Sequence, residues 1–363
     1  NAKNIWTYMY WSDDQGKDSF IMVVDDGDGM SKDELLNRAL NIPKDEHVDK
    51  GENDHSVYGL GLKAGSFNHC TSITIITKKD ELIKKTLNLK DGITDNMPSC
   101  IEHKFVKKHL EDLNSRKSGS IVLWSDLDNL TKLRASERGP NFYEDCDKAK
   151  KHFKLIYHKY LLENKINLFF NGKEEINKTK KFDPFYKDNP NTIILPGSEI
   201  SFLKGGTSKI TPYIIPIDTT NENLGKSRNE LQGLYFLRKN RVIDYGGWFG
   251  LGEKNVDKFW GTSERFNRLR IEIEIPIETS KDWITDSKNQ VNIPGYGYSK
   301  IRKCLIQIRK DYLEKVNLMN GENKQPINET LKKRNELIRM LRNSVLNKEE
   351  LVKIEKSIKE LNE

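Results

Sequence analysis

The chain has 363 residues, four cysteines and a net charge of +7 from 61 basic and 54 acidic residues. At roughly 100–200 residues per domain, this length predicts two domains and an appendage. No apolar run approaches the ~18 residues that a membrane span needs, so we expect no membrane partner. None of the cysteines stands in a CxxC pair, which favours a reduced, cytoplasmic protein over a disulfide scaffold or a zinc protein.

In chain order, the first predicted elements alternate between strands and helices. A β-rich run over 18–24 ends in an acidic, glycine-containing turn. We expect a helix directly after Met30, because Ser31 is a good N-cap and Glu34 follows three residues later. The polar stretch 41–56 predicts a mobile loop, and the glycine-punctuated stretch after it could open a helix. Further along we expect strands over 72–77 and 120–124, an amphipathic helix over 147–163, and a strand ending in the hairpin-turn signal Asn171-Gly172.

The second half predicts a separate α+β unit. The polar stretch 181–190, with two prolines, is typical of a linker. Beyond it we expect strands over 210–217, 234–237 and 268–277, then a helix over 298–318. From residue 327 onward the apolar spacing predicts a helical hairpin or coiled coil, or helices packed on their own domain. The expected domains are therefore 1–178, 191–320 and a helical tail over 327–363.

The motif Asp25-Asp26-Gly27-Asp28-Gly29-Met30 is the first with chemical content. A calcium loop would place Val24 and Leu35 at positions that must be acidic, which excludes it. A plain polar turn remains an alternative. In the functional interpretation, a strand delivers one ionised carboxylate that accepts a hydrogen bond from the adenine amine. The adjacent glycines allow the backbone to approach the ligand closely.

The motif Tyr58-Gly59-Leu60-Gly61-Leu62-Lys63 is the second. It lacks the GKS or GKT ending of a Walker A loop, and its next glycine falls one residue late for GxGxxG. Tight packing of glycines is the alternative. A phosphate cradle fits better, with exposed N–H groups, a helix start and a lysine cation. The third signal, Gly119-Ser120 opening an apolar strand, is weak alone.

In this order and spacing, the three motifs resemble the GHKL superfamily, which includes gyrase, large heat-shock chaperones, MutL and histidine kinases. The second motif, Tyr58–Lys63, resembles the superfamily's glycine-rich lid motif, and its form looks most like that of the MORC and MutL members. The resemblance implies an α+β chain: a Bergerat-type ATPase sandwich, an S5-like transducer domain, and the helical tail. It implies ATP and Mg²⁺ as cofactors, with nucleotide contacts at Asp25, Gly27, Gly29, Met30, Gly59, Leu60, Gly61, Leu62, Lys63 and Ser120.

The same resemblance implies further roles. Asn1 resembles the N-box asparagine that holds magnesium, although Asn4 competes for that register. The family's general base, a glutamate four residues earlier, would lie upstream of residue 1. The stretch 233–243 resembles the transducer strand pair, and 286–291 resembles the loop with the phosphate-sensing lysine. Lys63 and Lys288 would then offset charge during hydrolysis, although a solvated loop lysine is the alternative for Lys288.

Three functions of ATP binding are compatible with this resemblance. One is a MORC/MutL-like clamp that closes as a nucleotide-dependent homodimer and acts on DNA in defence or repair. The second is a chaperone-like clamp on protein clients. The third is a nucleotide-binding module without catalysis. A histidine kinase is disfavoured, because a separate transducer domain follows the ATPase region.

Overall fold

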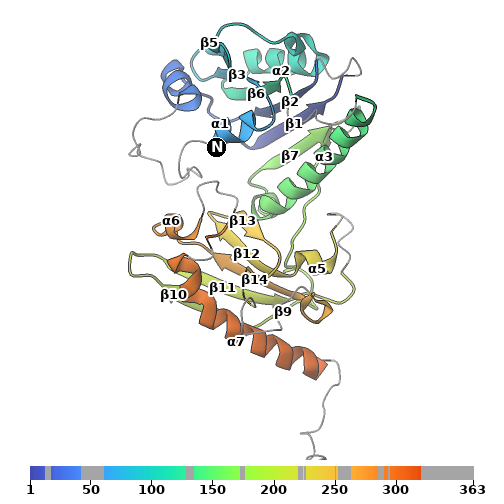
Figure 1. Ribbon diagram of the computed structural model, residues 1–363, viewed down its shortest axis with the longest axis vertical. Helices are drawn as coiled ribbons and strands as arrows, with labels where there is room; N and C mark the ends of the chain where they lie inside the picture. The colour runs from blue at the N-terminus through green and yellow to red at the C-terminus, as the bar shows by residue number, and fades with distance from the viewer. Residues whose placement is uncertain are drawn as a thin grey trace, which may run out of the picture. The chain divides into compact units, whose positions relative to one another are not determined.

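The protein is described by a computed structural model (Figure 1). The described residues are 1–12, 18–41, 61–127, 135–171, 176–219, 224, 226–249, 251, 263–284, 290–292 and 295–319. The chain divides into two compact units, Asn1–Cys304 and Leu305–Glu363. The first unit contains two sheets, rich in antiparallel pairs, with helices between and around their strands. The expected α+β class is confirmed.

The first sheet has eight strands in the order β5-β4-β3-β6-β2-β1-β7-β8. Among them, β1 and β7 pair in parallel and the other neighbours are antiparallel. The strands expected over 72–77 and 120–124 are present as β3 and β6. The bounds are β1 Asn4–Tyr10, β2 Phe20–Asp25, β3 Ser72–Lys78, β4 Leu82–Asn88, β5 Gly92–Thr94, β6 Gly119–Ser125, β7 Asn167–Asn171 and β8 Ile176–Lys178.

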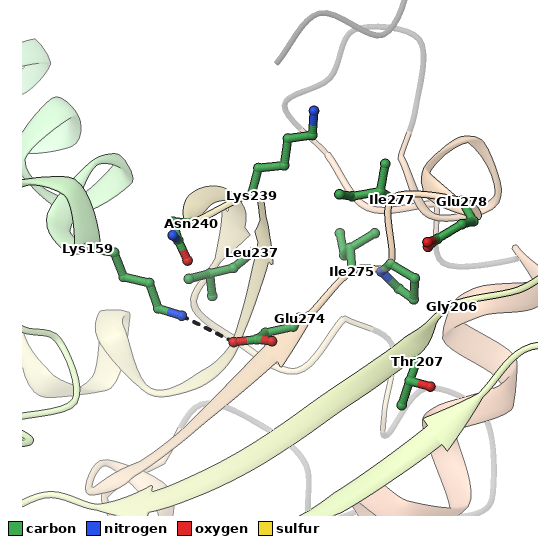
Figure 2. Close-up of a pocket in the computed structure, with 11 residues that line it drawn as sticks. Lys159, Gly206, Thr207, Leu237, Lys239, Asn240, Glu274, Ile275, Ile277 and Glu278 are labelled. Carbon is green, nitrogen blue, oxygen red and sulfur yellow. Dashed lines mark hydrogen bonds and ion pairs between the residues drawn. The ribbon is translucent and has the colours of Figure 1, made fainter. Parts of the chain in front are cut away.

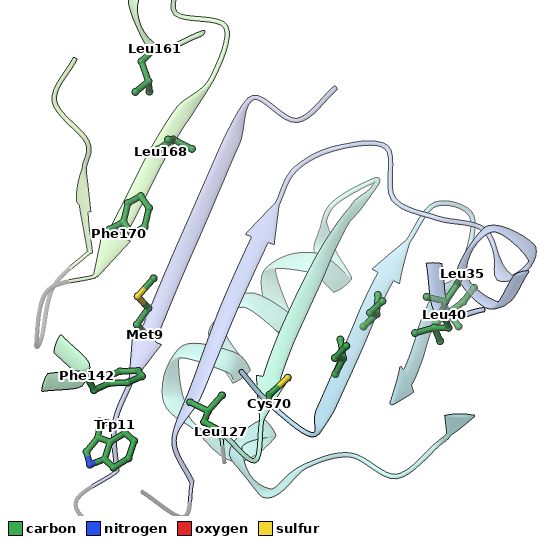
Figure 3. Packing of buried hydrophobic residues seen from close by; sticks show 13 residues of the cluster. Met9, Trp11, Leu35, Leu40, Cys70, Leu127, Phe142, Leu161, Leu168 and Phe170 are labelled. Carbon is green, nitrogen blue, oxygen red and sulfur yellow. The ribbon is translucent and has the colours of Figure 1, made fainter. Parts of the chain in front are cut away.

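Two apolar clusters cover the two faces of this sheet, because successive strand residues point to opposite sides. On what we call the first face, Met9, Ile75 and Phe170 belong to a core that also includes Leu35 and Leu161 from helical segments (Figure 3). On the second face, helix α2 (Lys104–Ser115), which follows the short turn η2 (Ser99–Glu102), packs Val106 and Leu113 against Met22, Val24 and Ile121.

The helix expected after Met30 is present as the π-helical segment η1 (Glu34–Leu40). The Ser31 N–H donates to the Glu34 carboxylate at 2.8 Å, and the Glu34 N–H donates to Ser31 Oγ at 3.3 Å, so the predicted capping pair forms. The Ser31 N–H, together with Lys79 at 3.0 Å, lowers the pKa of Glu34 to about 2. Leu35 and Leu40 enter the core of the first face. The lid motif also opens a helix, α1 (Gly61–Phe67), as its glycines suggested.

The helix expected over 147–163 is longer and is divided in two. Helix α3 (Ala135–Ile156) ends where Tyr157 leaves helical geometry, with φ −104° and ψ 19°, and α4 (His158–Leu162) follows. After α4, strands β7 and β8 form the antiparallel hairpin predicted at Asn171-Gly172. Asn171 anchors this hairpin to β1: the Met9 N–H donates to its side-chain oxygen at 2.8 Å, and its amide donates to the Met9 carbonyl at 3.0 Å.

The second sheet has the path β10-β11-β14-β12-β13, with β9 paired to β11. β12 and β14 are parallel neighbours, and the described pairs around them are antiparallel. The three strands expected in this half are present as β11, β12 and β14. The bounds are β9 Ile193–Ile194, β10 Ser198–Ser201, β11 Thr207–Ile214, β12 Gly233–Arg238, β13 Arg241–Tyr245 and β14 Leu269–Glu274, with helices α5 Arg228–Leu231, η5 Glu264–Phe266, α6 Ser280–Trp283 and α7 Tyr296–Met319.

The stretch 181–190 differs from the exposed linker that its polarity suggested. Phe185 is fully buried and packs its ring edge-on against Tyr235, with ring centroids 5.2 Å apart. Phe182 joins the same core, which also includes Leu155 and Ile156 from the end of α3. The segment is therefore part of the apolar contact between α3 and the second sheet. The helices predicted over 327–363 lie outside the described residues.

Candidate functional site

Three polar side chains form a row across adjacent strands of the first sheet. Asp25 on β2 pairs with Ser120 on β6, and Ser120 pairs with Thr77 on β3. Directly paired antiparallel residues point to the same side. Asp25 also pairs with Ile5, which packs with the core of the first face. The row therefore lies on the first face, and it brings together two residues that the sequence singled out, Asp25 and Ser120.

Thr77 was not anticipated, yet it connects the row to the glycine turn. Its side chain is fully buried. Its Oγ1 accepts a hydrogen bond from the Met30 N–H at 2.9 Å and lies 3.0 Å from Ser120 Oγ and 3.2 Å from the Gly119 carbonyl. The sequence shows only a threonine at the end of an apolar strand. Its place in the site becomes visible only when β3 pairs with β6, which sets Thr77 beside Ser120. The hydroxyl fixes the end of the turn beside Asp25.

The two adjacent aspartates of the motif have opposite electrostatic environments. Burial raises the pKa of Asp25, against the effect of the Gly27 N–H, which donates to Asp25 Oδ1 at 2.8 Å. Burial also acts on Asp26, but hydrogen bonds outweigh it and lower the pKa of Asp26. These come from the N–H groups of Asn4 and Lys3, both at 2.8 Å, and from the Asn4 amide at 2.6 Å.

This difference separates two roles within the motif. Asp26 ties the turn to the start of β1, because its carboxylate is occupied by groups of Lys3 and Asn4. Asp25 is the one held in a partly desolvated position, where an acceptor is strengthened toward a ligand donor. Among the described contacts, Asp25 has only the Gly27 N–H on Oδ1. A carboxylate oxygen is thus left for a ligand amine.

Gly29 and Gly119 allow the turn to lie directly on the strands. Gly29 has φ +68°, and a Cβ there would lie 1.9 Å from the Lys78 carbonyl oxygen. Gly119 has φ +147°, and its Cβ would lie 2.6 Å from the Asp25 carbonyl oxygen. Both positions therefore require glycine for backbone contact as well as for conformation. The turn at Gly29 is therefore packed directly against the end of β3.

We expect Gly29→Ala to destabilise the fold by about 3 kcal/mol or more, from left-handed strain and the displaced strand together. Gly65→Ala in α1 is the matched control, because a Cβ at Gly65 has no neighbour within 4 Å. Alanine favours a helix interior, so that variant should gain about 0.5–1 kcal/mol. Urea unfolding of both variants measures this. Equal midpoints for the two variants would show that the close approach at Gly29 is not required.

At the N-terminal end of the site, Asn1 lies beside Asp28. The Asn1 amide donates to Asp28 Oδ2 at 2.5 Å, and both side chains are exposed. Asn1 was the predicted metal ligand; Asp28 beside it was not anticipated as a neighbour. Together they present side-chain oxygens, the donor type that Mg²⁺ takes. Within the described residues no group of three or more His, Cys, Asp or Glu side chains could hold a metal ion.

The lid motif is described only in part. Gly61, Leu62 and Lys63 begin α1, and the Leu62 side chain packs against the core of the first face. Gly59, Leu60 and Lys288 lie outside the described residues, and so does the Lys63 side chain. Residues on either side of Lys288 are described: Ile284 and Val291 form a bridge, and the Val291 N–H donates to the Asp244 carboxylate at 3.1 Å. The roles of these residues stay predictions.

Two further observations concern the cysteines and the possibility of a membrane-spanning helix. The four cysteines are free thiols, and burial raises the pKa of Cys70, Cys100 and Cys146 to about 12. A raised pKa of this kind is typical of structural cysteines in apolar surroundings. Through the part of the chain that the structure describes, no helix has both the length and the apolar character that crossing a membrane requires.

The chain was compared with known proteins. Residues 1–120 match the family described as histidine kinase-, DNA gyrase B-, and HSP90-like ATPase. A solved structure titled "Crystal Structure of N terminal domain of a DNA repair protein" aligns with a TM-score of 0.49 and 16% identity, over 88% of this chain and 90% of that one. No curated protein matches the chain. Asp25, Gly29, Thr77 and Ser120 all lie within residues 1–120, the part of the chain that is similar to this family of ATPases.

Proposed function

We propose that the chain binds ATP on the first face of its first sheet and hydrolyses it as a conformational switch. The row Asp25, Ser120 and Thr77 carries this proposal, since it combines a partly desolvated acceptor with two hydroxyls inside a GHKL-type domain. The Asp25 carboxylate would accept a hydrogen bond from the adenine amine. The turn at Gly27 and Gly29 would provide the close backbone approach.

Asn1 and Asp28 fit the magnesium that such a site takes. Mg²⁺ at nucleotides is held by one or two protein oxygens together with phosphates and water, so it does not need a cage of protein ligands. The contact between Asn1 and Asp28 supplies side chains of this type. When bound, the ion would offset phosphate charge. Lys63 at the start of α1 would add a cation beside the phosphates, and Lys288 would do so from the second half of the chain.

The output we propose is a clamp of the MORC/MutL type. Two chains would pair when ATP is bound and separate after hydrolysis, and DNA would be the partner enclosed. The mild positive charge of +7 supports a polyanionic partner. DNA binding that weakens steeply with salt is the corresponding observable, because displaced counterions set the slope.

Calorimetry and light scattering test this function. The chain should bind ATP with one site per protomer. In the presence of Mg²⁺ and a non-hydrolysable ATP analogue its scattering mass should double, whereas with ADP it should stay at one protomer. If calorimetry shows ATP binding but the scattering mass does not change, the clamp is contradicted while the nucleotide site is supported. A chain that binds no adenine nucleotide would contradict the whole proposal.

A further inference from the structure

A large cavity is lined by both sheets of the first unit. Its volume is about 1040 Å³, and its wall includes Ile5 of β1, Asn1 and Ala2 just before β1, and the β12–β13 turn residues Lys239 and Asn240. Ile5 is the cross-strand neighbour of Asp25. The cavity therefore opens on the same face as the Asp25 row, at the end marked by Asn1. Its volume is at the upper end of the range of ligand pockets.

Lys239 and Asn240 form the two-residue turn of the β12–β13 hairpin. Arg238 pairs with Arg241 on either side of the turn, and the two turn residues have φ values of 47° and 63°. Such a turn needs left-handed geometry at both positions and favours Asn-Gly or Gly-Gly. A lysine at the first position is strained, because a side chain with a Cβ disfavours left-handed geometry. The sequence thus places a cation where glycine or asparagine would be easier to accommodate.

The turn is held in position from the helical side. The Tyr160 hydroxyl on α4 donates to the Lys239 carbonyl at 2.6 Å. The preceding residue, Lys159, forms an ion pair at 3.3 Å with Glu274, which lies on β14 and pairs with Leu237 of β12. Figure 2 shows the Lys239 side chain extending away from this ion pair. The hydrogen bond from Tyr160 fixes the backbone of Lys239 in the turn.

We propose that Lys239 and Asn240 form a phosphate subsite of the nucleotide site, contributed by the second sheet. The inference rests on the proposed function. It adds a cation to those implied by the lid motif and by the 286–291 loop. Asn1 and Lys239 share one cavity, so a triphosphate beside Asn1 would have a lysine on the facing wall. Lysine binds phosphate as a point charge, and the Asn240 amide can donate a further hydrogen bond.

Lys239→Gly provides the sharpest test, because glycine relieves the left-handed strain while it removes the charge. The variant should be as stable as the parent or more stable, and it should bind a non-hydrolysable ATP analogue about tenfold to a hundredfold more weakly. Lys239→Arg keeps the charge and should retain most of the affinity. Lys90→Ala, an exposed lysine in the turn between β4 and β5, is the control and should leave affinity unchanged.

Calorimetric affinities for the ATP analogue, ADP and adenosine are the readout, together with urea unfolding of each variant. Adenosine affinity should be the same in Lys239→Gly and parent, because adenosine carries no phosphate. Equal affinity of both proteins for the ATP analogue would overturn the subsite. Equal loss for adenosine and the analogue would overturn it as well. If the parent itself binds no nucleotide, the proposed function has failed, which is a distinguishable result.

Discussion

Replacing Asp25 with asparagine should weaken adenine nucleotide binding by tenfold to a hundredfold without destabilising the chain. A charge-assisted hydrogen bond contributes about 1.5–3 kcal/mol, and each 1.4 kcal/mol is a factor of ten in affinity. Asparagine keeps the Oδ1 that accepts from the Gly27 N–H at 2.8 Å. Calorimetry with ADP measures the first effect, and urea unfolding at pH 7 measures the second.

The stability half of this prediction follows from the direction of the pKa shift. Burial raises the pKa of Asp25, so its stabilising contribution is complete below its unfolded value and is lost as the pH rises through the folded value. In its ionised form the buried carboxylate is therefore a cost to the ligand-free fold. Asparagine removes this cost. The Asp25 charge lowers the stability of the ligand-free fold, but the proposed hydrogen bond to the adenine amine requires it.

Asp26→Asn is the matched control and should behave in the opposite way. Hydrogen bonds hold the pKa of Asp26 below its ordinary value, so its contribution is present above the unfolded value and is lost as the pH falls through the folded value. In the variant an amide would face the Asn4 amide, which now donates at 2.6 Å. We expect a loss of about 1–3 kcal/mol. Similar destabilisation of both variants would contradict the two roles assigned here.

Replacing Glu272 with alanine should have the largest effect on stability. Glu272 on β14 has a side chain only 5% exposed, and it lies 2.5 Å from Lys159 Nζ and 2.7 Å from Lys187 Nζ. The Tyr213 hydroxyl donates to it at 3.2 Å. Removing one partner of a buried ion pair costs about 3–5 kcal/mol, because a charge is left without compensation. Urea unfolding at pH 7 measures the loss.

The same carboxylate should make the parent sensitive to acid. Burial alone would raise the pKa of Glu272, but the two lysines outweigh burial and lower it. Its contribution is therefore present above its unfolded value and is lost as the pH falls through the folded value. The variant should lose less stability than the parent on acidification through this range. Lys148→Ala, in an exposed pair with Asp145 on α3, is the control and should not change stability measurably. An unfolding midpoint for Glu272→Ala equal to that of the parent would contradict this assignment.

The local parts of this account could be predicted from the sequence. The end of β2 at Asp25, the Ser31–Glu34 capping pair and the turn after Asn171 each depend on residues a few positions apart. Propensity and spacing contain that information. The same holds for Ser120, since a small polar residue opening a strand is a local signal, although a weak one.

The remaining features depend on residues far apart in the chain. Thr77 gains its role from Ser120, and Lys159 meets Glu272 more than a hundred positions later. The segment 181–190 is polar in composition, yet Phe185 is fully buried because α3 and the second sheet meet around it. Composition alone could not distinguish this packed segment from a linker. That Lys239 and Asn1 line one cavity likewise depends on tertiary structure and not on local sequence.

The central claim is that Asp25 recognises the adenine amine, and calorimetry with ADP and inosine diphosphate tests it most directly. Inosine has a carbonyl oxygen where adenine has the amine, so that position of the base cannot donate to a carboxylate. The parent should prefer ADP by at least about tenfold, in line with the loss of a charge-assisted hydrogen bond. In Asp25→Asn the amide can donate to that oxygen, and the preference should disappear. Equal affinity of the parent for the two nucleotides would contradict the assignment of Asp25.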